Sequence, residues 1–279
     1  MAGAGRWVDA QRLHHRGAGV SKRRGPPAYL PGRGAPLSRD SAQVCREVLI
    51  ALDTADEYLG LAAYADGQLL AEETRLVGQN HSAELLPSLA GLLARLRADL
   101  KAVRAVGVSL GPGSFNGIRV GVSTAKALAY GLDVPVIGVP TLEVQAWQFA
   151  AFGLPVACLQ PAGREVVFGV FEFKGGETVR LVAERVGSLA ELAKVLPERA
   201  VVCGTLPPGR VEELRRYARG GWVSVFGPVV RRRPGVLAEL AWGRLVAGRT
   251  DDPLTLEPLY VRPPHITPPR RSPFSSDAA

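Results

Sequence analysis

Apolar and polar positions alternate in a way that divides residues 47–151 into short strands and amphipathic helices. The run "EVLIALDT" at residues 47–54 is almost continuously apolar and contains β-branched residues, which is typical of a buried strand. Two further strands are predicted on either side of Asp66-Gly67, a dipeptide that favours a two-residue hairpin turn. An amphipathic helix should follow, with Pro87 in its first turn, because leucines recur at helical spacing at Leu85, Leu89, Leu92 and Leu96.

The same segment continues with a strand at 102–110, a helix supplied by the stretch 109–132, a strand at 134–139 and a helix that starts behind Thr141 as a cap. The resulting order, β-β-β-α-β-α-β, matches the ribonuclease H-like unit, a mixed sheet with helices on its faces. We therefore expect an α/β protein whose first lobe is residues 47–151.

The second half of the chain has weaker patterns. Strands are predicted at 156–159, 165–173, 178–184 and 200–204, and helices at 188–196, 211–218 and 235–247. We expect a smaller second lobe at residues 152–262, built as a degenerate copy of the first. Residues 1–46 and 263–279 are rich in Pro, Gly, Arg or Ser and have no apolar period, so they are predicted to be disordered.

The net charge of +8 belongs mainly to the first 46 residues, which hold nine lysines and arginines against two aspartates. The remaining chain is close to neutral, so its folded part has little electrostatic attraction for RNA. The basic segment has three interpretations: an RNA-binding arm, a transit-type segment, or an upstream extension from a misplaced start of translation.

Cysteine use and hydropathy point to a cytoplasmic protein that does not enter a membrane. Three cysteines are far apart in the sequence and form no C-x-x-C pair, which suggests neither a disulfide framework nor a zinc site. No window approaches the roughly 18 consecutive apolar residues that a membrane span needs.

The stretch "SLGPGSFNGIRVGVSTAKALAYGL" at residues 109–132 places glycines between a strand and a helix, where a phosphate-binding loop would lie. The Walker pattern fails because Gly113 and Gly117 are one residue too close and Ile118 stands in place of Lys. The dinucleotide fingerprint fails because its third glycine would fall on Asn116. Two hypotheses remain: a structural tight turn, or a general anion site formed by Gly113, Ser114 and Asn116 at the start of the helix.

The helix after this loop has two apolar stripes, whereas a helix on one face of a sheet needs only one. The first stripe contains Ile118, Val122, Ala125 and Ala129. The second contains Gly117, Gly121, Thr124 and Leu128. This second stripe predicts close packing against another part of the chain or against a partner protein. The polar side chains gather in one arc, at Arg119, Ser123, Lys126 and Tyr130.

Ionisable residues offer few candidates for catalysis. No H-x-x-x-H, H-E-x-x-H or G-x-S-x-G motif occurs, and His81 lies at a helix start, where a capping role is expected. Asp53 and Thr54 end the first strand, where ribonuclease H-like and actin-like folds commonly hold a metal-linked phosphate. The glycine of the actin-like D-x-G-T loop is missing here, so a strand-end carboxylate bonded to backbone is an equal alternative.

Several segments together resemble the bacterial TsaB family of tRNA threonylcarbamoyladenosine biosynthesis proteins, which are also described as YeaZ-like and glycoprotease-related. They are "ILALDTADEYLGLAAY", "QNHSAELLPSLAGLL", "GVSLGPGSFNGIRVGVSTAKALA", "VPVIGVPTLEVQA" and "EPLYVRPPHIT". The chain departs from the family at "CLQPAGREVVF", where an aspartate and arginine run is frequent, and nothing in the family matches residues 1–46.

The resemblance implies a two-lobed actin-like scaffold without catalytic residues or a metal of its own. Such a subunit joins a homologous metal-dependent transferase (TsaD-like) and a small ATPase (TsaE-like), contacts tRNA only through the complex, and can form a dimer. ATP or ADP with Mg²⁺ is implied at the level of the complex only. The implied partner contacts are Leu86, Leu93, Gly117, Gly121, Thr124 and Leu128.

Two other functions compete with a scaffold. One is an actin-like ATPase, sugar kinase or peptidase that acts on its own, with Asp53 as its central carboxylate. The other is an RNA-binding protein that acts through the basic N-terminal segment.

Overall fold

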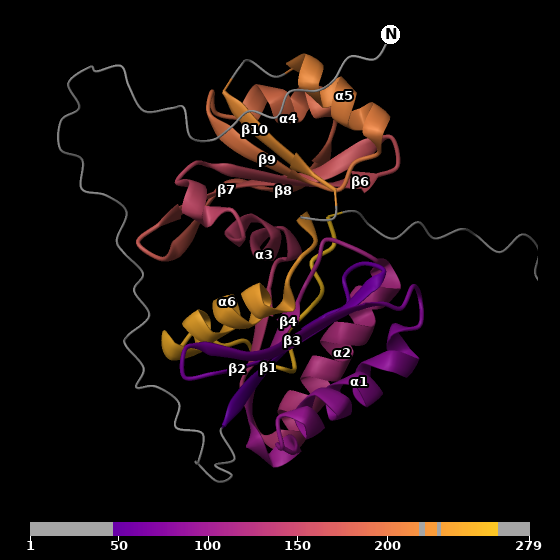
Figure 1. The fold of residues 1–279 in the computed structure, drawn as a ribbon, viewed down its shortest axis with the longest axis vertical. Helices are drawn as coiled ribbons and strands as arrows, with labels where there is room; N and C mark the ends of the chain where they lie inside the picture. The colour runs from indigo at the N-terminus through magenta and orange to yellow at the C-terminus, as the bar shows by residue number, and fades with distance from the viewer. Residues whose placement is uncertain (1–46, 218–220, 228–229, 262–279) are drawn as a thin grey trace, which may run out of the picture.

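The computed structural model describes residues 47–217, 221–227 and 230–261. The segments predicted to be disordered, 1–46 and 263–279, lie outside the described residues. The described chain forms two lobes, and each lobe is built on a five-stranded sheet (Figure 1).

The first sheet has the strand order β3-β2-β1-β4-β5. Its strands are β1 (Val48–Asp53), β2 (Tyr58–Ala65), β3 (Gln68–Leu76), β4 (Val103–Ser109) and β5 (Val136–Val139). β1 pairs antiparallel with β2 and parallel with β4, so the sheet is mixed. The predicted hairpin at Asp66-Gly67 is confirmed, since both residues have positive φ, 51° and 75°, as a type I′ turn requires.

Helices cover both faces of the first sheet (Figure 1). α1 (His81–Arg95) and α2 (Phe115–Leu132) lie on one face, where Leu85, Leu89 and Ile118 join a buried apolar cluster. A short 3₁₀ turn at Leu100–Ala102 leads from α1 into β4. Ser114 caps α2, as the sequence suggests, but His81 caps nothing: it is the first buried residue of α1, and Asn80 stands at the cap position.

The second sheet repeats the topology of the first. Its strands are β6 (Val156–Ala162), β7 (Glu165–Lys174), β8 (Glu177–Gly187), β9 (Ala200–Gly204) and β10 (Trp222–Phe226), and their order is β10-β9-β6-β7-β8. Two helices, α4 (Leu189–Val195) and α5 (Pro208–Tyr217), precede β9 and β10. Each lobe therefore reads β-β-β-α-β-α-β, and the fold is the predicted two-lobed, actin-like arrangement of ribonuclease H-like units.

α3 (Thr141–Trp147) lies between the two lobes (Figure 1). Its Val144 joins the core of the first lobe, whereas Leu142 and Ala146 join a core of the second. A 3₁₀ turn at Ala150–Phe152 then leads to β6. Thr141 is the first helical residue rather than the cap, and its hydroxyl accepts a hydrogen bond from the Gly111 N–H at 2.9 Å.

The last helix, α6 (Pro234–Val246), covers the second face of the first sheet. Leu237, Ala238 and Ala241 are buried there against Leu49 and Ala51 of β1. From its place in the chain, after β9 and α5, this helix is expected in the second lobe. The structure corrects that assignment, since the core of the first sheet needs an apolar cover on both faces.

Residues after α6 also return to the first lobe. The Asp251 N–H donates to the Val136 carbonyl at 2.9 Å, and the Lys126 ammonium of α2 donates to the carbonyls of Leu254 and Leu256, at 3.3 Å and 3.0 Å. Farther along, the Leu259 N–H donates to the Leu110 carbonyl at 2.8 Å. This segment, residues 247–261, is the C-terminal strap, and it contacts Arg119 and Lys126 of the polar arc of α2.

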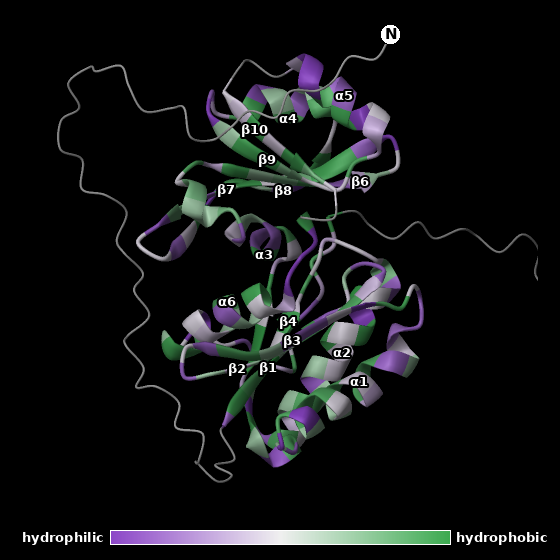
Figure 2. Cartoon of the chain, viewed as in Figure 1, coloured by the Kyte–Doolittle hydropathy of each residue, from purple (hydrophilic) through white to green (hydrophobic). Residues whose placement is uncertain are grey.

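Hydropathy follows the layers of the fold. In Figure 2 the strands of both sheets are mostly green, whereas the helices mix green with purple along their length. None of the helices in the described part of the chain is long and apolar enough to cross a membrane.

Two cysteines that are distant in the sequence meet in the second sheet. Cys158 of β6 and Cys203 of β9 are register partners, and their sulfur atoms are 3.2 Å apart. Both are reduced and buried, and burial raises the pKa of the Cys158 thiol well above its ordinary value, with Cys203 adding to the rise. They serve as apolar core residues of this lobe.

Candidate functional site

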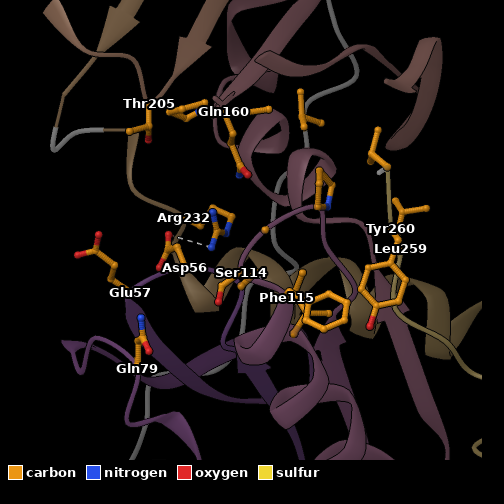
Figure 3. Close-up of a pocket in the computed structure, with 18 of the residues that line it drawn as sticks. Asp56, Glu57, Gln79, Ser114, Phe115, Gln160, Thr205, Arg232, Leu259 and Tyr260 are labelled. Atoms are coloured by element: carbon orange, nitrogen blue, oxygen red, sulfur yellow. Dashed lines mark hydrogen bonds and ion pairs between the residues drawn. The ribbon is translucent and has the colours of Figure 1, made fainter. Parts of the chain in front are cut away.

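A pocket of about 1040 Å³ lies between the lobes (Figure 3). The first lobe contributes the turn after β1, the loop before α2 and the end of the C-terminal strap. The second lobe contributes the end of β6 and the residue after β9. The labelled side chains in the pocket are Asp56, Glu57, Gln79, Ser114, Phe115, Gln160, Thr205, Arg232, Leu259 and Tyr260.

The glycine loop before α2 is pressed against the turn after β1. The Ser114 N–H donates to the Ala55 carbonyl at 2.7 Å, and a side chain at Gly113 would place its Cβ 2.1 Å from that same oxygen. Only glycine fits at 113 because a backbone atom lies where a Cβ would be. The loop therefore binds the chain's own backbone, which supports the structural-turn hypothesis for these residues.

Small residues of α2 extend this contact along the helix. A Cβ on Gly117 would lie 2.1 Å from the Thr54 carbonyl, and one on Gly121 would lie 2.3 Å from the Thr54 hydroxyl. The Thr54 hydroxyl donates to the Gly117 carbonyl at 2.7 Å, and the Gly117 N–H donates to the Ser114 hydroxyl at 3.3 Å. Gly117 and Gly121 of the small-residue stripe thus pack on Thr54, in the turn after β1.

Asp53, at the end of β1, is held by Arg232, a residue that no sequence motif marks. The Arg232 Nε donates to Asp53 Oδ2 at 2.9 Å, and Arg232 Nη2 donates to Asp56 Oδ2 at 2.9 Å. Asp53 Oδ1 also accepts the Ala55 N–H at 3.0 Å and the Ser109 hydroxyl at 2.9 Å. The side chains of Asp53 and Arg232 are each only 6% exposed, so this is a buried ion pair.

Both members of this pair are charged. Burial alone would raise the pKa of Asp53, but the Arg232 charge and the hydrogen bonds from Arg232, Ala55 and Ser109 hold it below its ordinary value. Burial likewise opposes the charge of Arg232, but the carboxylates of Asp53 and Asp56 raise its pKa. Breaking one half of such a pair leaves an uncompensated buried charge, which is strongly destabilising.

The carboxylate of Asp53 does not fit the Mg²⁺ ion of the metal-bound phosphate that an actin-like fold implies, and two N–H groups at the start of α2 are already used. A metal needs carboxylate oxygens that are free to coordinate it, and a phosphate needs free N–H groups at the helix start. Here both Asp53 oxygens are hydrogen-bonded, and the N–H groups of Ser114 and Gly117 bind Ala55 and Ser114. Thr54 is fully buried in the packing contact with α2, and Asn116 is exposed in the first turn of that helix.

The expected partner-contact residues differ widely in their exposure, and half of them are buried. Leu93, Gly117 and Gly121 are buried, so no partner reaches them in this conformation. Thr124 and Leu128 are partly buried, and Leu128 packs on the core of the first lobe. Leu86 is the exception, with 53% of its surface exposed.

Comparison with known proteins identifies the family. The family model described as "TsaD: tRNA N6-adenosine threonylcarbamoyltransferase" matches residues 74–221, more than half of the chain. TsaB of Bacillus subtilis is 30% identical over 152 residues, which are 54% of this chain and 66% of that protein. TsaB of Escherichia coli is 36% identical over 98 residues, which are 35% of this chain and 42% of that protein. The chain belongs to the TsaB family, within the wider TsaD-related family.

The matched regions span about two thirds of the length of the Bacillus subtilis protein and about two fifths of that of the Escherichia coli protein. A solved structure from Pseudomonas aeruginosa, described as an uncharacterized protein with similarity to peptidase YEAZ, matches the fold more completely. It covers 77% of this chain and 100% of its own, with a TM-score of 0.68 and 24% identity. That likeness extends the shared fold over both lobes.

Proposed function

We propose that this chain is a non-catalytic scaffold in the complex that forms N6-threonylcarbamoyladenosine at position 37 of ANN-decoding tRNAs. It binds and activates a homologous metal-dependent transferase, a TsaD-like subunit, and a small TsaE-like ATPase completes the assembly. Membership of the TsaB family supports this proposal, as do the names of the relatives, which are tRNA threonylcarbamoyladenosine biosynthesis proteins.

The observation that carries the scaffold role is the state of the interlobe pocket. Arg232, which lines the pocket, is paired with the buried strand-end carboxylate of Asp53, and the glycine loop of the pocket is bonded to the chain's own backbone. Among the described residues there is no group of three or more His, Cys, Asp or Glu side chains placed to hold a metal ion. These contacts favour a subunit that supplies a binding surface rather than reacting groups.

The surface that we assign to the transferase is the outer face of α1 and α2, which lie together on one side of the first sheet (Figure 1). Leu86 is 53% exposed and Tyr130 is 75% exposed on these two helices. Exposed small residues, Ala90, Ser123 and Ala127, accompany them on the two helices. Large apolar anchors among small residues favour close helix-to-helix approach.

The test is binding to the transferase subunit of the same organism, measured by calorimetry with the full chain. Leu86→Arg and Ala127→Arg place a long charged side chain on the outer face and should weaken binding at least about tenfold. Val246→Arg is the matched control, because Val246 is 71% exposed on α6, which covers the opposite face of the sheet. Gly121→Arg is unsuitable, since its side chain would collide with Thr54.

Three outcomes decide against parts of this proposal. Full binding by both arginine variants would show that the partner sits elsewhere. No binding by the wild-type chain, together with turnover of a substrate by the isolated chain, would refute the scaffold role. If the two variants instead abolish self-association of the chain, a second copy occupies the face.

A further inference from the structure

Three consecutive arginines, Arg231, Arg232 and Arg233, lie where the chain returns from the second lobe to α6. Each one contacts the first lobe. Arg231 lies over the Tyr58 ring, with its guanidinium carbon 3.4 Å from the ring centroid, and Arg233 Nε donates to Glu72 Oε1 at 3.0 Å. Arg232 alone is buried, between Asp53 and Asp56. A run of like charges is ordinarily solvated, so the burial of the middle member indicates a specific role.

The guanidinium of Arg232 occupies the place that a divalent cation would take between two carboxylates. Its Nε and Nη2 meet Asp53 Oδ2 and Asp56 Oδ2, both at 2.9 Å, and Nη2 is also 3.4 Å from Asp53 Oδ1. Mg²⁺ would need those same oxygens at about 2.0–2.1 Å in octahedral geometry. Both cannot be accommodated, because the guanidinium already fills the space between the two carboxylates.

The backbone on both sides of Arg232 is held in place by the first lobe and α3. The Gln145 side-chain amide of α3 donates to the Val230 carbonyl at 3.1 Å, and Pro234 begins α6 two residues after Arg232. Unlike a free ion, the guanidinium is covalently tethered to this connection and cannot diffuse away.

We propose that Arg232 is a built-in counter-ion that replaces a divalent metal ion at the end of β1. It neutralises Asp53 permanently and thereby prevents this carboxylate from binding a metal–nucleotide complex. The inference rests on the contacts of Arg232 and does not depend on the scaffold function.

The proposal predicts that removing the guanidinium creates a metal site. Arg232→Met keeps much of the side-chain length without the charge, and it leaves Asp53 and Asp56 facing an unfilled space. Titration of the full chain with Mn²⁺, followed by the electron paramagnetic resonance signal of the free ion, should show binding to this variant at least about tenfold tighter than to wild type. Arg233→Met is the control, because it removes the neighbouring charge from an exposed pair with Glu72 and should bind Mn²⁺ like wild type.

A second variant keeps the test decisive if Arg232→Met is unstable. The double variant Arg232→Met, Asp53→Asn carries no charge at either position of the buried pair. It should therefore be more thermally stable than Arg232→Met alone and should bind Mn²⁺ no better than wild type. Millimolar Mn²⁺ should raise the melting temperature of Arg232→Met but not that of the double variant. The proposal is overturned if folded Arg232→Met binds Mn²⁺ as weakly as wild type, or if neither Mn²⁺ nor Asp53→Asn restores a destabilised Arg232→Met. It is also overturned if the wild-type chain binds Mn²⁺ through Asp53.

Discussion

Replacing Gly117 with alanine tests whether the glycines of α2 exist for close packing. The new Cβ would lie 2.1 Å from the Thr54 carbonyl, whereas ordinary contact begins at 3.4 Å, so α2 and the turn after β1 must separate by more than an ångström. That movement would strain the hydrogen bond from the Thr54 hydroxyl to the Gly117 carbonyl, and the bond from the Ser114 N–H to the Ala55 carbonyl.

The expected loss follows from three opposing contributions. Overpacking costs roughly 1–3 kcal/mol. Weakening two buried hydrogen bonds costs about 1 kcal/mol each. Alanine returns up to about 1 kcal/mol because it favours the helix more than glycine does. The net destabilisation is roughly 2–4 kcal/mol, which corresponds to a fall in Tm of roughly 5–15 °C for a chain of this size.

The matched control lies in the same helix. Gly131 is exposed, and a Cβ there would meet nothing within 4 Å, so Gly131→Ala should stabilise the chain by up to about 1 kcal/mol. Thermal melts of the full chain followed by circular dichroism would compare the two. Equal Tm values for Gly117→Ala and wild type would refute the claim that Gly117 is required by its contact with Thr54.

Two further predictions concern charge. Because the pKa of Asp53 is lowered in the folded chain, its stabilising contribution is fully present above the unfolded value of about 3.9 and is lost as the pH falls through the folded value. Urea midpoints measured from pH 7 down to pH 3 should therefore decline at the acid end, and the proposed role of the pair is contradicted if Asp53→Asn shows the same decline. Lys126→Met removes the bonds to the Leu254 and Leu256 carbonyls, so limited proteolysis should cleave the C-terminal strap faster than in wild type, whereas Lys194→Met in α4 should not change the rate.

Sequence patterns predicted the first lobe well because its elements are local. The leucine spacing of α1 specifies a helix and its buried side, and the Asp66-Gly67 dipeptide specifies a hairpin turn. β10 was missed, since this short edge strand has no fully buried residue and so shows a weak pattern. For α6, periodicity revealed an apolar side but not which sheet that side covers.

The candidate site was harder to predict because its decisive contact is distant in the chain. Asp53 and Thr54 were singled out from their place at a strand end, yet Asp53 and Arg232 are 179 residues apart. Three adjacent arginines ordinarily indicate a solvated surface. The proline directly after them was the available signal, because it marks a helix start and therefore a fixed backbone position.

The return of α6 to the first sheet makes the second lobe, residues 156–226, an insertion within the first. A fragment that ends after α3 would contain all five strands of the first sheet. It would expose the apolar surface that Leu237 and Ala241 of α6 cover in the full chain. Dissection by truncation is therefore a poor route to an isolated leading half. Removing the inserted second lobe and joining α3 to the segment before α6 keeps the first sheet together with the helices on both of its faces.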